Sequence, residues 1–168
     1  MKGFNTPAIG LAITLSLFII AHSRAQTPDE QKTGGSSMSH YELLAEGAYS
    51  AIEEPRQAVL RESGALGTLW AAHSAHLSPA PAPPVVDFAS HTVVAVFAGN
   101  QPTGGHALAV SGLEKAPGGW VLRVALVKPA PDCMVTQVIT QPWLLVSLPG
   151  RDLAVTVKIA ESARPCGP

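Results

Sequence analysis

Charged residues are scarce in this chain: only 14% of its 168 residues are Asp, Glu, Lys or Arg. The formal net charge is −1 at pH 7, and removing an N-terminal segment that contains Lys2 and Arg24 takes away two positive charges and leaves −3. Nucleic acids and anionic membrane surfaces attract clusters of basic residues, which this composition does not supply. We therefore predict a globular protein with no nucleic-acid partner.

The sequence also lacks the usual catalytic and metal-binding motifs. It has no Gly-x-Ser-x-Gly and no His-Glu-x-x-His segment, and the glycine pairs at 104–105 and 118–119 fit neither nucleotide-binding glycine pattern. His73 and His76 have the spacing of one helical turn, but no third ligand can be assigned to them. We therefore predict that the protein is not an enzyme and has no catalytic residue, metal site or cofactor.

Cysteine is limited to two residues, Cys133 and Cys166. A redox thiol would need a Cys-x-x-Cys spacing or an activating base, and the sequence places neither. In an exported protein, a single pair of cysteines most simply forms one disulfide. We therefore predict a disulfide between Cys133 and Cys166, which joins the C-terminal tail to the region near Pro131.

Residues 8–21 form an apolar run at the N-terminus that is interrupted only by small or hydroxyl side chains. A bilayer span needs about 20 such residues, so this run is too short. Lys2 precedes it, and Ser23-Arg24-Ala25 follows with small residues where a signal peptidase reads the chain. We predict a signal peptide over residues 1–25, with an uncleaved anchor as the alternative. The mature protein is then periplasmic or secreted and has no membrane span.

A linker rich in Thr, Pro, Gly and Ser is predicted for residues 26–40, and one folded domain for residues 41–168. The expected fold class is α+β, mainly β: a single antiparallel domain, sandwich-like or barrel-like, with one packed helix near residues 64–76. Ser63 is placed to cap this helix. The apolar positions of the helix recur at three- and four-residue steps: Leu66, Leu69, Trp70, His73 and Leu77.

Six segments rich in β-branched and apolar residues predict strands: 56–61, 92–98, 107–113, 120–127, 143–148 and 153–159. Residues 92–98 are nearly all apolar, which indicates a strand covered on both faces. The turn sequence at 116–119 predicts that the strands before and after it form a hairpin, and the turn sequence at 149–152 predicts a second hairpin. Residues 41–49 are ambiguous between helix and strand.

The segment Asn100-Gln101-Pro102-Thr103-Gly104-Gly105-His106 follows the apolar run of residues 92–97. Proline fixes φ for the first corner of a turn, and glycine adopts positive φ without a Cβ clash. We predict a rigid loop with few side chains, and a strand that returns from it. Such a loop suits backbone contacts with a protein partner and holds no catalytic group.

Several motifs resemble the PrcB C-terminal domain family, and the similarity runs from about Ser50 to Pro149. Family members typically carry a tyrosine after the two glycines and another after a later proline, where this chain has His106 and Trp143. The segments that carry the resemblance are Leu69-Trp70, Val86-Asp87-Phe88, Phe97, Gly99, Pro102-Thr103-Gly104-Gly105 and Thr140-Gln141-Pro142-Trp143.

The family is named after an accessory lipoprotein that associates with a surface protease and supports the stability of that complex. The resemblance therefore implies an exported, non-enzymatic protein-binding module whose partner is a peptidase. Because no cysteine lies near the predicted cleavage site, we expect a form without a lipid anchor. The alternative is that Pro102-Thr103-Gly104-Gly105 and Pro142-Trp143 are only turns and core residues that the fold requires. The predicted partner-binding residues are Asn100, Gln101, Pro102, Thr103, Gly104, Gly105, His106 and Trp143.

A second resemblance is to the chagasin-type inhibitors of cysteine peptidases, which present three loops at one end of a β domain. The chain has corresponding segments in the same order, at residues 100–104, 117–119 and 141–143. Rigid loops of this kind can enter an active-site cleft. The alternative function is therefore direct peptidase inhibition by these loops.

Overall fold

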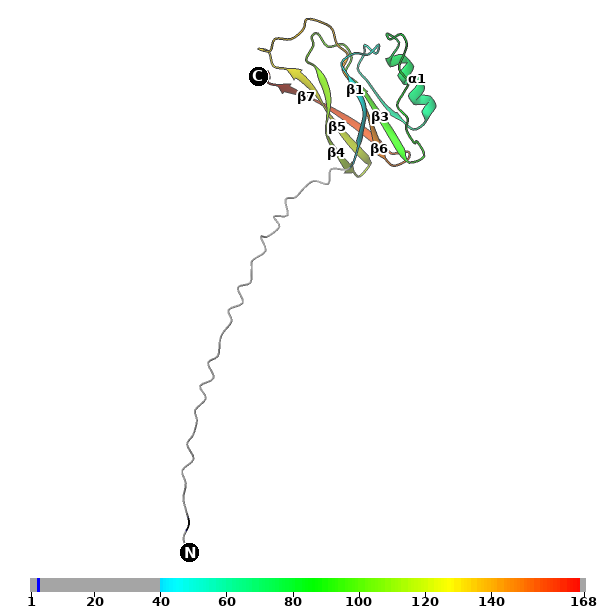
Figure 1. Ribbon diagram of the computed structural model, residues 1–168, viewed down its shortest axis with the longest axis vertical. Coiled ribbons are helices and arrows are strands. Elements are labelled where there is room, and N and C mark those ends of the chain that lie inside the picture. Colours follow the sequence, from blue (N-terminus) through cyan, green and yellow to red (C-terminus); the bar gives the residue numbers. More distant parts are fainter. Residues whose placement is uncertain (1–2, 4–39, 167–168) are drawn as a thin grey trace. The chain divides into compact units, whose positions relative to one another are not determined.

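The structure is a computed structural model that describes residue 3 and residues 40–166 (Figure 1). The signal peptide predicted for residues 1–25 and the linker predicted for residues 26–40 lie outside the described residues, except for Gly3 and His40. No helix in the described ranges is long and apolar enough to cross a membrane. From His40 to Cys166 the chain is mainly β with one helix, as predicted.

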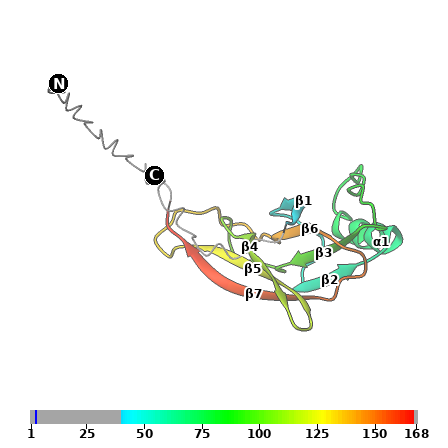
Figure 2. The ribbon, with the colours of Figure 1, turned by 90° about the horizontal axis from the view of Figure 1, so that it is seen from below.

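The strands from residue 40 to residue 166 form two separate sheets, so the fold is sandwich-like and not a closed barrel. In Figure 2, β7 lies along one side of this domain and α1 along the other. The four-stranded sheet contains, in spatial order, β1 (Glu42–Gly47), β6 (Trp143–Pro149), β3 (His91–Phe97) and β2 (Arg56–Leu60). The three-stranded sheet contains β4 (Ala107–Ala116), β5 (Gly119–Pro129) and β7 (Val155–Arg164).

Strand β3 is buried on both faces, which confirms the prediction for residues 92–98. Its side chains alternate between two apolar clusters: Val94 and Val96 pack between the two sheets, whereas Val93 and Phe97 pack on the helix side. Strand β6 divides in the same way, because successive side chains of a strand point to opposite faces. The two central strands thus hold the three layers of the domain together.

The helix α1 spans Ser63–His73. It begins one residue earlier than expected, so Ser63 is its first residue, and Glu62 is the N-cap but makes no side-chain capping bond. It ends at His73, where both the backbone N–H and the hydroxyl of Ser74 donate to the carbonyl of Trp70. The predicted apolar stripe is buried from Leu66 to His73. Leu77 lies beyond the helix and is exposed.

The pairing predicted between residues 143–148 and 153–159 is wrong. Strand β6 pairs with β1 and β3, whereas β7 pairs with β5 in the other sheet. The turn between them crosses from one sheet to the other, and Thr92 secures it: its hydroxyl donates to the carbonyl of Gly150 and accepts from the N–H of Leu153. In the sequence β6 lies between β5 and β7, but it belongs to the other sheet. The chain therefore reverses direction in β6 and reverses again into β7, so that β7 runs parallel to β5. The hairpin predicted around residues 116–119 is confirmed.

Two further segments differ from, or add to, the local prediction. Residues 42–47, which are ambiguous in sequence between helix and strand, form the edge strand β1 against β6. Residues 107–113 are predicted to return beside β3, but β4 lies in the three-stranded sheet. The loop at 98–106 therefore connects the two sheets and is not a hairpin turn.

Candidate functional site

The loop of residues 98–106 packs against a second loop, residues 130–142, which connects β5 to β6. The backbones of Gln101 and Thr140 exchange two hydrogen bonds, with N···O distances of 2.7 and 3.1 Å. The N–H of Gly104 donates to the carbonyl of Thr136 at 2.9 Å, and the hydroxyl of Thr140 donates to the carbonyl of Thr103 at 3.0 Å. Backbone groups that could have met a partner are therefore already used inside the protein.

Gly104 and Gly105 of this loop are each explained by a different structural requirement. A Cβ at Gly104 would overlap the hydroxyl of Thr136, so the close approach of the two loops requires a residue without a side chain there. Gly105 has φ of +82°, in the left-handed region where residues with a Cβ are strained. The alternative interpretation, in which these residues serve the fold, thus explains Gly104 and Gly105 by packing and conformation alone.

Two of the predicted partner-binding side chains are buried. His106 is 9% exposed, and its Nδ1 donates to the carbonyl of Thr103 at 3.0 Å, because a carbonyl oxygen can only accept. Trp143 is 8% exposed, and its ring centroid lies 4.1 Å from that of His73 and 5.8 Å from that of Trp70. Neither side chain projects from the surface as an anchor.

The exposed members of the predicted set are Asn100, Pro102 and Gly105. Asn100 lies at the start of the loop, and its side-chain oxygen accepts a hydrogen bond from the Gln141 amide at 2.7 Å. The carbonyl of Pro142 accepts from the N–H of Ala98 at 2.8 Å. The structure therefore brings the two predicted segments together, with Trp143 beneath the surface that they form.

The second loop carries exposed apolar side chains that the sequence patterns did not identify as a site. Met134 is fully exposed, Ile139 is 58% exposed and Val138 is also exposed. The only charged residue among residues 98–109 and 130–142 is Asp132. A loop of this length without secondary structure is uncommon and is frequently functional, so its length was the signal that could have identified it. An apolar, uncharged surface is typical of the centre of a protein interface.

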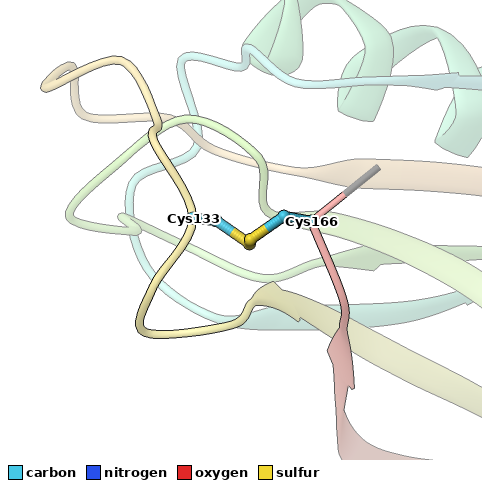
Figure 3. Close-up of a disulfide and its surroundings, with 2 residues drawn as sticks. All are labelled: Cys133 and Cys166. Atoms are coloured by element: carbon cyan, nitrogen blue, oxygen red, sulfur yellow. A yellow bond between two sulfur atoms is a disulfide. The ribbon is translucent and has the colours of Figure 1, made fainter. Parts of the chain in front are cut away.

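The predicted disulfide between Cys133 and Cys166 is present, with Cα atoms 5.2 Å apart (Figure 3). It ties the loop 130–142 to the chain directly after β7. The N–H of Ala130 also donates to the carbonyl of Arg164 at 3.0 Å. Both ends of the apolar segment are thus held, because Thr140 is bonded to Gln101 at the other end. A disulfide is compatible with a location outside the cytoplasm.

A pocket of about 740 Å³ lies next to these loops, at the C-terminal end of α1. The β1–β2 connection forms one wall, and its backbone is joined to both loops: the carbonyl of Glu53 accepts from the N–H of Asn100, and the carbonyl of Ala48 accepts from the N–H of Gln141. The pocket has a size typical of ligand sites. Its lining includes Tyr49, Glu53, Trp70, His73, Gln141 and Trp143.

His73 lies at the base of this aromatic cluster and is almost fully buried. Its Nδ1 is 2.9 Å from the hydroxyl of Ser50. Burial, and secondarily the neighbouring His76, lowers the pKa of His73 below its ordinary value. Within residues 40–166, the only group of three potential metal ligands is Asp132, Cys133 and Cys166, whose sulfurs form the disulfide.

The three loops expected from the chagasin resemblance do not lie at one end of the domain. Ala107, beside the loop 98–106, and Ala116, beside the turn at 117–119, are the two ends of β4. A strand of this length separates them by about 30 Å. The third segment, at 141–143, ends in a buried tryptophan. The structure therefore does not form the three-loop wedge that the alternative function needs.

Residues 92–149 match the family model described as PrcB C-terminal. This stretch runs from β3 to the end of β6 and includes the loops 98–106 and 130–142. It ends where the resemblance is expected to end but begins at residue 92, not at Ser50. No curated protein and no solved structure matches the chain.

Proposed function

We propose that the protein is an exported, non-enzymatic subunit that binds and stabilises a protease complex, since residues 92–149 match the PrcB C-terminal family. The observation that carries the proposal is the loop 130–142. It presents Met134, Val138 and Ile139 to solvent although it is clamped by a disulfide and by hydrogen bonds to the loop 98–106. Apolar side chains that are exposed on a constrained loop favour a protein interface.

The proposed binding surface consists of the loop 130–142 together with the exposed part of the loop 98–106, Asn100, Pro102 and Gly105. It differs from the surface expected from the sequence, because Trp143 and His106 support it from inside. Export fits the disulfide, and the low charge of the two loops fits recognition by apolar contact at this surface.

The test is partner capture with the protein immobilised in an envelope extract. A double variant, Met134→Asp with Ile139→Asp, places two charges on the proposed surface without opening the core. The control is Val85→Asp, which adds one charge at a fully exposed apolar residue outside both loops. We expect the wild-type and control proteins to recover a complex that contains a peptidase, and the double variant to recover at least about tenfold less, since apolar anchors in an interface are worth about 2 kcal/mol or more.

Recovery of no peptidase, or equal recovery by all three proteins, would contradict the proposal. The effect on the captured peptidase separates stabilisation from inhibition. A stabilising subunit lengthens the half-life of peptidase activity at elevated temperature and leaves the initial rate unchanged. A direct inhibitor lowers the initial rate. The mass of the exported protein tests the predicted cleavage after Ala25.

A further inference from the structure

The pocket at the C-terminal end of α1 has a distinctive combination of aromatic walls and negative charge. Tyr49 on its rim is 54% exposed, and Trp70 and Trp143 form part of the deeper wall. Glu53 is the only acidic residue in the lining, which contains no lysine and no arginine. A volume of about 740 Å³ is sufficient for a complete side chain.

From this combination we infer that the pocket receives a basic side chain, preferably arginine, from the protein partner. That the occupant belongs to a protein rests on the proposed function, and the chemistry of the occupant rests on the pocket itself. Guanidinium groups pair with carboxylates and stack on aromatic rings, so Glu53 and Tyr49 offer both kinds of contact.

Charge beyond the lining also favours a cation. Glu46, Glu53 and Glu54 lie in or next to the β1–β2 connection, and the first basic residue after them is Arg56 at the start of β2. None of these three glutamates forms an ion pair within the part of the chain that the structure describes. This acidic segment includes the β1–β2 connection, which forms the rim of the pocket.

The end of α1 adds to the same field. A helix carries a partial negative charge at its C-terminus, where its last carbonyl groups lack partners within the helix. The pocket is lined by His73, the last residue of α1, and by His76 and Leu77 just after it. The buried His73 has a lowered pKa and is therefore neutral at pH 7, so it does not repel a cation. The lining offers no lysine or arginine to an anionic ligand.

The test is a titration of the protein with N-acetyl-arginine amide, followed by the three indole N–H signals in ¹⁵N NMR spectra. Trp70 and Trp143 line the pocket, whereas Trp120 lies on β5 and serves as the internal reference. We expect saturable shifts of the first two signals, with a dissociation constant on the order of 1 mM for so small a probe, and no shift of the third.

Two comparisons separate charge from shape. N-acetyl-citrulline amide has nearly the same shape without the charge, and we expect roughly tenfold weaker binding. Glu53→Gln should weaken arginine binding about threefold at low salt. Glu62→Gln, at the other end of α1, makes the same change of charge about 15 Å away and should leave binding unchanged.

Equal binding of the arginine and citrulline probes, or no shift of Trp70 and Trp143 with either, would overturn the inference. Tighter binding of tetramethylammonium than of the arginine probe would overturn it too, in favour of a small quaternary ammonium ligand. A partner that is captured through Met134 and Ile139 while the arginine probe fails would leave the proposed function standing. Binding of the probe without capture of any peptidase would contradict the proposed function but leave the preference of the pocket for a basic group standing.

Discussion

Replacing Gly104 by alanine tests whether the two loops of the proposed surface support each other. The Cβ of alanine would overlap Thr136 Oγ1. Two of the three staggered rotamers of Thr136 turn its hydroxyl or its methyl group towards position 104, because the side chain is β-branched. Either the threonine adopts another rotamer or the two loops separate, and separation strains the hydrogen bond from the N–H of Gly104 to the carbonyl of Thr136.

The magnitude follows from two opposing contributions. Overpacking at a close contact costs about 2–3 kcal/mol. Alanine restricts the unfolded chain more than glycine does, which offsets about 0.5–1 kcal/mol. We therefore expect Gly104→Ala to lower the free energy of unfolding by about 1–2.5 kcal/mol. Thr136→Ala removes the overlapping oxygen, and the Cβ atoms at positions 104 and 136 would then lie 3.5 Å apart, an ordinary van der Waals contact.

The assay is urea unfolding of the two single variants and the double variant, which together form a mutant cycle. Thr136 is exposed, so its replacement alone should cost no more than about 0.5 kcal/mol. The double variant should regain most of the loss. Gly118→Ala is the control, because nothing lies within 4 Å of its Cβ position. A loss at Gly104 no larger than at Gly118, or a loss that Thr136→Ala does not relieve, would refute the packing of the loops described above.

Two further properties of the protein can be tested by unfolding. Replacing both Cys133 and Cys166 by serine should cost about 4 kcal/mol, the chain-entropy value for a sequence separation of 33 residues, and should speed hydrogen exchange in the loop 130–142; an unchanged urea midpoint would contradict this. Burial lowers the pKa of His73 in the folded state, so the unfolded state binds more protons as the pH falls through the ordinary histidine value of 6.5. Stability should therefore be complete well above pH 6.5 and should fall as the pH decreases below it. This fall should be smaller in His73→Gln than in the wild-type protein, and equal falls would show that His73 is not its source.

Much of the fold follows from local patterns. The run of residues 92–98 has no polar face, which predicts a strand covered on both sides, and β3 is such a strand. The spacing from Leu66 to His73 predicts one buried helical stripe, which α1 has. Strand pairing follows less directly, because alternation identifies the inner face of a strand but not its neighbour. For that reason the short turn at residues 149–152 predicts a hairpin, although it connects two sheets.

In the candidate site, too, some features follow from local sequence and others depend on tertiary packing. Pro102 to Gly105 is identifiable as a rigid loop, since proline and glycine restrict or extend the backbone through their own covalent structure. The burial of Trp143 is not identifiable, because it depends on where Trp70 and His73 of α1 pack. The role of Gly104 depends in the same way on Thr136, which is 32 residues away in the sequence.

The mainly β composition, the helix near residues 63–73, the disulfide pairing and the position of the glycine loop follow from the sequence alone, because each depends on local side-chain pattern, backbone freedom or the number of cysteines. Three features are visible only in the folded domain: the loop 130–142 covers the glycine loop, Trp143 lies beneath both, and an acidic, aromatic pocket opens beside them. These features arise where segments distant in the chain meet, and such meetings depend on the packing of the whole domain.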